Sequence, residues 1–268
     1  MRNAFFRSLP LVLLLHGCSP DPGSTRIIAH GGAGSDHPPN SREALLHALA
    51  IGAHGIEMDV QLTADSVLVL FHDQYLDEIS TCKGLINSST WKELKACRVP
   101  NDGKQTSIER VDSLLLEAAA LYPEAEFALD CKLFAHGEWW PYLETFSRAL
   151  ARLHDKSALR GKLVIECMVD DFLLLVQRKR PGLALSFYTD DPQKGTMRAV
   201  ASHYSGITLH HRHISAGEVR YAQGLGLKVT LVSPGDRWGH WRTMRKRPDR
   251  IQTDRPGSLL SGQGAFTN

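Results

Sequence analysis

Two carboxylates, Glu57 and Asp59, and the imidazole of His72 lie within one short stretch of the sequence, residues 55–73. Successive side chains of an extended strand point to opposite faces, so Glu57 and Asp59 share one face of the strand-like run 56–62. The other face of this run is apolar and carries Ile56, Met58 and Val60. The acidic face is therefore either exposed to water or holds something positively charged.

A second strand-like run, residues 67–71, follows after only four residues. Parallel strands need a crossover of about a dozen residues or more, so the two runs are expected to form an antiparallel hairpin. With Ala64 and Asp65 as a two-residue turn, Glu57 is predicted to lie opposite His72, at a spacing of about 4.5–5.5 Å. A bulge would shift this register by one residue.

Three more polar residues fall at the ends of other predicted strands. His30 precedes a glycine-rich loop, and Asp130 and Lys132 share the polar face of the run 126–133. Carboxylates that converge on one site favour a hard divalent ion, Mg²⁺ or Ca²⁺. Lys132 is suited to a phosphate oxygen, or forms a simple ion pair with Asp130. Histidines at the rim of such a site could act as base and acid in displacement at phosphorus.

Strand-like and helix-like segments alternate along most of the chain, which is typical of a (β/α)8 barrel. The rival, a doubly wound open sheet, would show a glycine-rich dinucleotide fingerprint after its first strand, and none is present. Reactive residues of a barrel belong at the C-terminal ends of its strands. Strands are expected at 26–30, 56–62, 126–133, 163–168, 183–188, 206–210, 228–232 and 250–253. Helices are expected at 42–51, 90–96, 111–121, 140–153, 171–179, 196–202 and 215–223, and the rest of 74–110 is expected to be irregular.

The first residues of the chain predict where in the cell the protein is located. Arg2 and Arg7 precede an apolar run, 9–15, that is too short to span a membrane. The run ends in Leu15-His16-Gly17-Cys18, which resembles the lipobox of a bacterial lipoprotein. We expect a signal peptide over 1–17, a lipid anchor at Cys18 and a tether over 18–25, hence an exported protein held on the membrane in the periplasm or at the cell surface. The alternative is an ordinary signal peptide that contains a cysteine.

Composition and cysteine usage add two expectations. The 268 residues carry a formal charge of +2 with no basic tract, so nucleic acid is not an expected partner. Cys131 and Cys167 sit in apolar strand-like runs, where a thiol is usually part of the core. Cys82 and Cys97 lie in a loop-rich segment and are the better candidates for a disulfide in an exported chain.

The order of short motifs resembles the glycerophosphodiester phosphodiesterase family over residues 26–260. The motifs are Ala29-His30-Gly31-Gly32, Pro38-Pro39-Asn40-Ser41, Gly55-Ile56-Glu57-Met58-Asp59-Val60, Thr63-Ala64-Asp65, His72-Asp73, Asp130-Cys131-Lys132 and Thr253-Asp254-Arg255-Pro256. The resemblance implies a TIM barrel over about 26–262 with a small insertion after the second strand, about 73–110. It implies one divalent metal at Glu57, Asp59 and Asp130, with His30 and His72 as the acid–base pair. The reaction would be hydrolysis of a small or lipid-derived phosphodiester.

The chain departs from the family pattern at four positions. Gly31 stands where the family usually has an arginine that contacts phosphate, and Pro39 stands in place of a glutamate. Asp130 replaces the commoner glutamate, and Leu231 falls where a tryptophan is frequent. These changes bear on the identity of the substrate more than on the catalytic set.

Two alternatives follow from these departures. Within the same class, a lysophospholipase D-like or sphingomyelinase D-like enzyme would act on lipid head groups. In a different class, a surface binding protein would have kept the barrel and lost catalysis. The missing arginine favours that second alternative, and the retained acids and histidines argue against it.

Other polar and aromatic residues have two interpretations. Asp73 could orient a histidine or cap a turn, whereas Thr253-Asp254 is expected to stabilise the barrel rim. We predict no second metal site at the neighbouring residues His210, His211 and His213, because they alternate faces and no acid or cysteine accompanies them. Trp238 and Trp241 could line the substrate entrance or pack a helix.

Overall fold

Eight parallel strands form a closed ring in the part of the chain that the structure describes, residues 25–32, 37–101, 104–233 and 235–261. The structure is a computed structural model. The first strand pairs with the last strand on one side and with the second on the other, which closes the barrel. The barrel strands are β1 (Arg26–Ala29), β2 (Gly55–Leu62), β6 (Glu126–Cys131), β7 (Leu163–Cys167), β8 (Ala184–Tyr188), β9 (Gly206–His210), β10 (Lys228–Ser233) and β11 (Arg250–Thr253). The predicted (β/α)8 barrel is confirmed.

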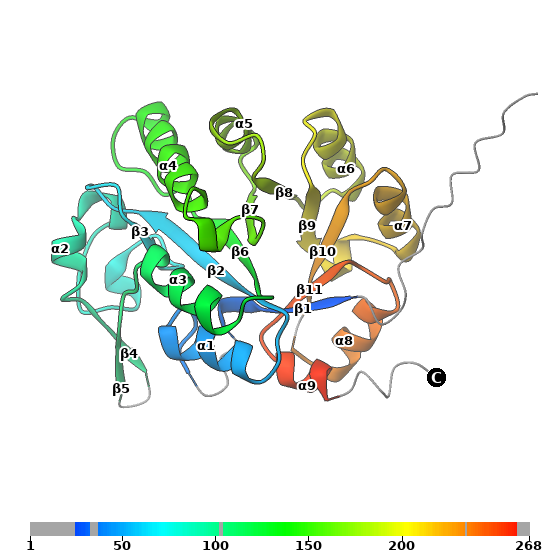
Figure 1. Ribbon diagram of the computed structural model, residues 1–268, viewed down its shortest axis with the longest axis horizontal. Helices are drawn as coiled ribbons and strands as arrows, with labels where there is room; N and C mark the ends of the chain where they lie inside the picture. The colour runs from blue at the N-terminus through cyan, green and yellow to red at the C-terminus, as the bar shows by residue number, and fades with distance from the viewer. Residues whose placement is uncertain (1–24, 33–36, 102–103, 234, 262–268) are drawn as a thin grey trace, which may run out of the picture.

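Helices connect the strands and lie outside the strand ring (Figure 1). They are α1 (Arg42–Ala50), α2 (Trp91–Leu94), α3 (Val111–Leu121), α4 (Trp139–His154), α5 (Asp170–Lys179), α6 (Pro192–Ala201), α7 (Ala216–Gly224), α8 (Arg237–Met244) and α9 (Pro256–Leu260). Every helix expected from the sequence is present. α6 begins earlier than predicted, because Asp191 caps the amides of Gln193 and Lys194 and Pro192 fits the first helical turn.

The helices α8 and α9 and the hairpin of β4 (Arg98–Asn101) and β5 (Lys104–Ser107) were not predicted. The sequence of α8, Arg-Trp-Gly-His-Trp-Arg-Thr-Met, has no apolar repeat and buries glycine, histidine and threonine instead of aliphatic side chains. The β4–β5 pair is short and mostly polar. Neither segment carries the hydrophobic period by which elements are recognised in a sequence.

Each barrel strand directs one face toward the helices and the other toward the barrel interior. Ile56, Met58 and Val60 pack into the main hydrophobic cluster with α1 and other helices. Glu57 and Asp59 are also buried, so their face is not exposed to water. The interior of the barrel is polar and includes Glu57, Asp59, Glu166, Ser186, Thr208, Thr230 and Gln252.

The hairpin of β2 and β3 (Leu68–Leu70) is antiparallel as predicted, but its register differs by one residue. Val60 pairs with Leu70, whereas the expected turn would have paired it with Val69. The loop holds three residues rather than two, because Ser66 takes a left-handed conformation, φ 64°. The prediction that Glu57 lies opposite His72 is therefore wrong, and His72 lies beyond the paired part of the hairpin.

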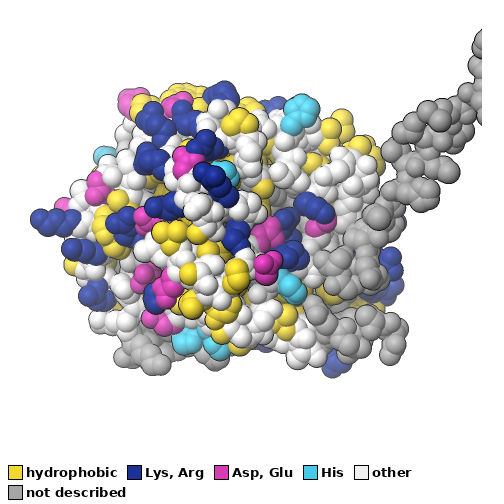
Figure 2. All heavy atoms as spheres, in the orientation of Figure 1, with side chains coloured by type: hydrophobic (Ala, Val, Ile, Leu, Met, Phe, Trp, Pro, Cys, Tyr) yellow, Lys and Arg dark blue, Asp and Glu magenta, His cyan; other side chains and the backbone are white. Residues whose placement is uncertain are grey.

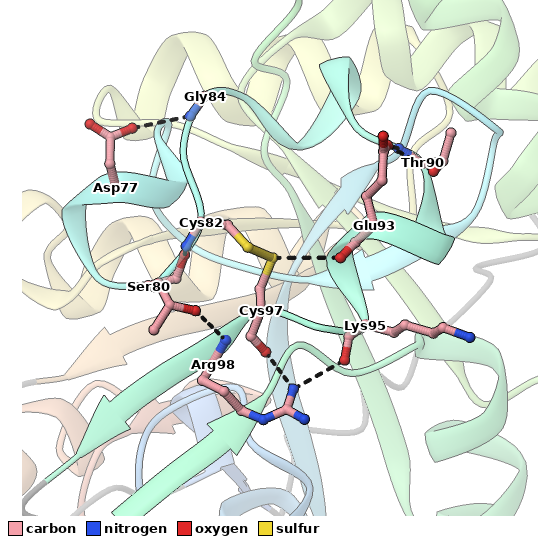
Figure 3. Close-up of a disulfide and its surroundings, with 10 residues drawn as sticks. Asp77, Ser80, Cys82, Gly84, Thr90, Glu93, Lys95, Cys97 and Arg98 are labelled. Carbon is pink, nitrogen blue, oxygen red and sulfur yellow. Dashed lines mark hydrogen bonds between the residues drawn. A yellow bond between two sulfur atoms is a disulfide. The ribbon is translucent and has the colours of Figure 1, made fainter.

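The segment between β3 and α3 folds around a small apolar cluster of its own. A disulfide joins Cys82 to Cys97, whose Cα atoms are 5.5 Å apart (Figure 3). The cluster consists of Val69, Phe71, Leu76, Ile86, Leu94, Cys97 and Ile108, and short 3-10 turns lie at Leu76–Glu78 and Ile86–Ser88. Cys131 and Cys167 are buried free thiols, as expected.

The predicted signal peptide, Cys18 and most of the tether lie outside the described residues. Thr25, expected to be the end of the tether, is buried and donates a hydrogen bond to the Pro248 carbonyl, 2.9 Å. Among the helices of the described ranges, none combines the length and the hydropathy that crossing a bilayer requires. The face shown in Figure 2 intersperses Lys and Arg with Asp and Glu.

Candidate active site

A cavity of about 870 Å³ opens where the barrel strands end at their C-termini. His30 and Gly31 follow β1, Asp59 lies on β2, and Asp254 and Arg255 follow β11. The other wall comes from the segment after β3 and includes His72, Ile79, Val99, Pro100 and Ile108. The closed barrel thus brings together residues from opposite ends of the chain.

Three acidic side chains meet beside this cavity, and one of them, Asp59, lines it. Oxygen atoms of Glu57, Asp59 and Asp130 all lie within 4.8 Å of one another. Two of the three come from β2 and the third from the neighbouring strand β6, where Asp130 pairs with Asp59. Burial raises the pKa of Glu57 to about 8 and also raises that of Asp130. The raised pKa values mean that the ionised acids are disfavoured in this site, and a cation among them would stabilise their negative charge.

Lys132 supplies one positive charge. Its Nζ lies 2.6 Å from Asp130 Oδ2 and 3.1 Å from Asp59 Oδ1. Burial lowers the pKa of Lys132, but the two aspartates outweigh it and raise the pKa above its usual value. The ion pair considered as one reading of Asp130 and Lys132 is present, and it includes Asp59 as well.

His30 lies between two carboxylates. Its Nδ1 is 2.7 Å from Asp254 Oδ1, and its Nε2 is 3.8 Å from Glu57 Oε2. The Glu57 carboxylate raises the pKa of His30 to about 10, against the opposing effect of burial, and Asp254 adds to the rise. Asp254, expected to stabilise the rim, therefore contacts a predicted catalytic histidine.

His72 has a similar partner. Its Nδ1 lies 2.7 Å from Oδ1 of the adjacent Asp73, and 59% of its side chain is exposed at the cavity wall. Of the two readings of Asp73, the structure shows the one that orients a histidine. Within the described residues, no aspartate pairs with Nε2 of either imidazole, and Nε2 of His30 faces Glu57.

Two residues whose contacts with the acids the sequence did not predict hold these acids in place. Asn40 donates through Nδ2 to Asp59 Oδ2, 2.7 Å, and its Oδ1 accepts from the Asp59 amide, 2.9 Å. The Gly31 amide donates to Glu57 Oε2, 3.0 Å. Asn40 and Gly31 both have positive φ values, 60° and 57°, and asparagine and glycine are the residues that tolerate this best. The presence of asparagine and glycine at these two positions was the signal in the sequence that could have pointed to them.

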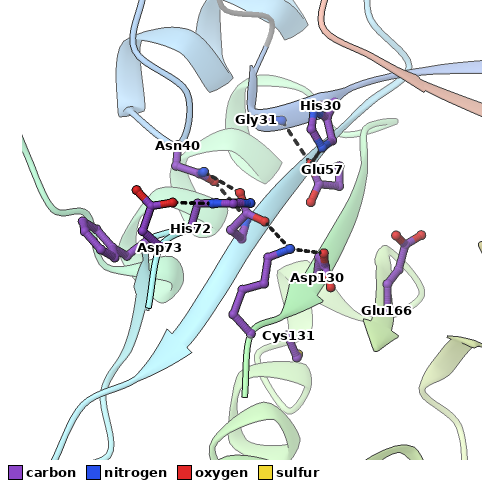
Figure 4. A network of polar contacts seen from close by, with 12 residues as sticks. His30, Gly31, Asn40, Glu57, His72, Asp73, Asp130, Cys131 and Glu166 are labelled. Atoms are coloured by element: carbon purple, nitrogen blue, oxygen red, sulfur yellow. Dashed lines mark hydrogen bonds and ion pairs between the residues drawn. The ribbon is translucent and has the colours of Figure 1, made fainter. Parts of the chain in front are cut away.

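Glu166 is a further buried carboxylate that the sequence did not suggest. It lies on β7 beside Asp130 of β6, inside the barrel (Figure 4). Its Oε2 accepts from Gln252 Nε2, 2.9 Å, and its Oε1 from Thr208 Oγ1, 3.0 Å. Burial raises the pKa of Glu166 to about 7. Both oxygens have protein partners, so Glu166 supports the floor of the site.

The remaining candidates lie elsewhere. His210, His211 and His213 cluster at the end of β9 with ring centroids 4.8 Å and 5.6 Å from His210, and none of them lines the cavity. Trp238 and Trp241 pack against each other on α8 and do not line it either. Leu231 is fully buried in the main hydrophobic cluster.

The three carboxylates fit a divalent ion. Ions of this class bind oxygen at about 2.0–2.6 Å, so the ligands of one ion lie at most about 4–5 Å apart. The spread of up to 4.8 Å agrees with this limit. Carboxylate oxygens are also the donors that Mg²⁺ and Ca²⁺ prefer, and no thiol or imidazole belongs to the group.

Comparisons with known proteins agree with this geometry. The family model described as the glycerophosphoryl diester phosphodiesterase family matches residues 30–233. A glycerophosphodiester phosphodiesterase of Bacillus altitudinis is 46% identical over 71 residues, 26% of this chain and 29% of that protein. The uncharacterized protein YqiK of Bacillus subtilis (strain 168) is 30% identical over 179 residues, 66% of this chain and 72% of YqiK.

A solved structure shares the fold. An Oleispira antarctica phosphodiesterase in complex with the product sn-glycerol-3-phosphate has a TM-score of 0.78 at 21% identity, over 89% of this chain and 96% of that chain. The region matched by the family model covers most of the chain and contains His30, His72 and all three acids. This chain belongs to the glycerophosphoryl diester phosphodiesterase family.

Proposed function

We propose that the chain hydrolyses a glycerophosphodiester to glycerol phosphate and an alcohol. The observation that carries the proposal is the meeting of three carboxylates, two of them buried and one partly buried, with two aspartate-bound imidazoles at one cavity. Membership of the family supports the reaction class. The matched segments span only part of the named relatives, so the substrate is inferred from the site itself.

Glu57, Asp59 and Asp130 would hold one divalent ion, Mg²⁺ or Ca²⁺. When bound, such an ion neutralises the phosphate and polarises a phosphoryl oxygen. Lys132 already lies beside two of these carboxylates and can add a positive charge to the same side of the phosphate. Asn40 and the Gly31 amide keep the carboxylates oriented while the substrate binds.

The two histidines would move the protons. As water attacks phosphorus, one imidazole takes a proton from it, and the bond from phosphorus to the alcohol oxygen breaks. The other imidazole gives its proton to that oxygen, so the alcohol leaves neutral. Asp254 and Asp73 fix the imidazoles through Nδ1, which leaves Nε2 for the transfer.

The test of this proposal uses the purified full chain and a panel of glycerophosphodiesters. We expect hydrolysis that stops in excess chelator and returns with Mg²⁺ or Ca²⁺, and loss of turnover in His72→Ala with the fold intact. His213→Ala, an exposed histidine outside the cavity, is the matched control and should retain activity. Full activity in excess chelator would contradict the role of the metal. Unchanged turnover in His72→Ala would contradict the catalytic role of that residue.

A binding measurement tests the metal without turnover. An ion at about 100 times its Kd should add about 2.7 kcal/mol to the free energy of unfolding. In a domain of this size, that raises the melting temperature by about 5–10 °C. Asp130→Asn should abolish most of the rise. Metal and phosphodiester binding without any product would favour the alternative of a binding protein that has lost catalysis.

A lipid-derived phosphodiester is a second candidate substrate, and the apolar wall of the cavity favours it. Ile79, Val99 and Pro100 face the cavity from the segment after β3, and Ile79 is 42% exposed. Such a wall suits an acyl chain better than a small polar alcohol. Analysis of the products of a lysophospholipid separates the routes, because the sphingomyelinase D-like route can leave a cyclic phosphate.

We also propose that the chain is exported and lipidated at Cys18. The support is the arrangement of Arg2, Arg7, the apolar run and the lipobox-like Leu15-His16-Gly17-Cys18. The wild-type chain should fractionate with membranes, and Cys18→Ala should release it. If Cys18→Ala stays with the membranes and the purified wild-type protein carries no lipid, the proposed lipid anchor is contradicted.

A further inference from the structure

We infer that Arg255 binds the anionic phosphate of the substrate, an inference that rests on the proposed phosphodiesterase function. Arg255 follows β11 and lines the cavity next to Asp254, the residue whose carboxylate contacts His30. Its role is that of a substrate-binding residue.

The charges of the cavity lining point to Arg255. The described lining contains four aspartates, Asp59, Asp73, Asp236 and Asp254, which repel a phosphodiester. Among the described lining residues, Arg255 is the single lysine or arginine. Lys132 lies near the acids, but its ammonium is already bonded to Asp59 and Asp130. An entering anion therefore meets one uncommitted, permanently charged side chain.

The guanidinium of Arg255 has no partner within the described ranges. The hydrogen bonds of this residue are made by its backbone: its amide donates to Thr253 Oγ1, 3.2 Å, and its carbonyl accepts from Ser258 Oγ, 2.8 Å. The hydrogen bond with His30 is the main cause of the lowered pKa of Asp254, and the Arg255 charge adds to it, but Arg255 and Asp254 form no ion pair. Asp254 instead contacts His30. A planar donor group without a carboxylate partner is free to bind two phosphate oxygens at once.

Gly235 determines where the Arg255 side chain lies. A Cβ added at Gly235 would come within 2.8 Å of Arg255 Cγ and 3.0 Å of its Cδ. The aliphatic part of the arginine therefore crosses directly over the glycine backbone, which also lines the cavity. Because Gly235 does not have a positive φ, an alanine there would displace the arginine without straining the backbone.

The strand register explains why the charge can come from this position. β1 and β11 are parallel neighbours, with Ala29 opposite Thr253. Gly31 and Arg255 each follow this pair by two residues, and both line the cavity. Gly31 is used for its backbone, since a Cβ there would meet Pro39 Cβ at 3.0 Å and φ is 57°. Arg255 supplies the positive charge that position 31 does not carry.

The test compares Arg255→Met, Arg255→Lys and Gly235→Ala in the full chain with metal present. Loss of a charge-assisted hydrogen bond should raise KM for the phosphodiester about 10–100-fold in Arg255→Met, with a much smaller change in kcat. Calorimetric titration with inorganic phosphate should show the same loss of affinity without turnover. Arg255→Lys should recover part of both, and Gly235→Ala should weaken both although the charge remains.

Matched controls keep the result specific. Arg220→Met removes an exposed arginine of α7, and Gly224→Ala adds a methyl group where nothing lies within 4 Å, so both should behave as wild type. If the wild type hydrolyses the phosphodiester and Arg255→Met has the same KM and phosphate affinity as the wild type, this inference alone is overturned. Absence of any phosphodiester hydrolysis by the wild type would overturn the proposed function instead.

Discussion

Each candidate catalytic histidine is held by an aspartate, but the two aspartates differ in origin. Asp73 is adjacent to His72 in the sequence, whereas Asp254 reaches His30 from the other end of the barrel, 224 residues away. An aspartate at Nδ1 fixes both the ring orientation and the tautomer. The position of His30 therefore depends on closure of the barrel between β1 and β11.

Asp254→Asn tests this arrangement. The amide keeps the shape of the side chain but removes the charge and can present its NH₂ group to Nδ1. We expect kcat to fall about 10–100-fold with KM nearly unchanged, because the aspartate orients the imidazole and does not bind substrate. Steady-state kinetics measure the effect, and Asp190→Asn, an exposed partner of His213 outside the cavity, is the control. A kcat equal to that of wild type would contradict a positioning role for Asp254.

At the scale of elements, the segment between β3 and α3 forms one wall of the cavity. Its apolar cluster and the Cys82–Cys97 disulfide hold together short turns, a one-turn helix and a hairpin. Elements this short do not persist alone, since each buries little apolar surface. The disulfide therefore stabilises the wall that faces the cavity.

Replacing both Cys82 and Cys97 by serine should loosen this wall. Opening a loop with a sequence separation of 15 costs about 3 kcal/mol in the chain-entropy estimate. We expect faster proteolysis within 74–110 and a higher KM, with a smaller effect on kcat. Limited proteolysis and kinetics measure both. Cys167→Ala, which removes a buried thiol of β7, is the control and should leave proteolysis of this segment unchanged. Proteolysis of the double variant at the wild-type rate would contradict the role of the disulfide.

At the scale of the molecule, the barrel buries polar groups at its centre and apolar groups between strands and helices. One buried polar residue outside the site carries a cost. His211 is 4% exposed at the end of β9, and neither ring nitrogen has a hydrogen-bond partner within the described part of the chain. Burial, followed by the charges of His210, Lys246 and Arg212, lowers the pKa of His211 to about 4, and Asp236 opposes them.

This pKa predicts a loss of stability in acid. Below about pH 6.5 the unfolded chain binds a proton at His211 that the folded chain does not bind until about pH 4. Stability therefore falls as pH falls through this window, by up to about 3 kcal/mol from this residue. Denaturant unfolding between pH 7 and 4 should show a flatter curve for His211→Leu than for wild type. His213→Leu, which is exposed, should follow the wild-type curve, and parallel curves for all three would contradict the prediction.

The sequence by itself determined the barrel and indicated most members of the candidate site. Alternation along β2 placed Glu57 and Asp59 on one face, and the run of strands and helices predicted the closed ring. The glycine after His30 and the apolar face of β6 also indicated which residues reach the C-terminal rim. These features are local, because the period of side chains along one strand is fixed by its backbone.

Tertiary structure alone decided how the site is assembled. The pairing of Asp254 with His30, the contact of Asn40 with Asp59 and the crossing of Arg255 over Gly235 join segments that no local pattern relates. The hairpin register also depended on a left-handed Ser66, a residue that rarely takes that conformation. A sequence fixes the face on which a side chain lies, but its partners are fixed only when strands distant in sequence pair and the barrel closes.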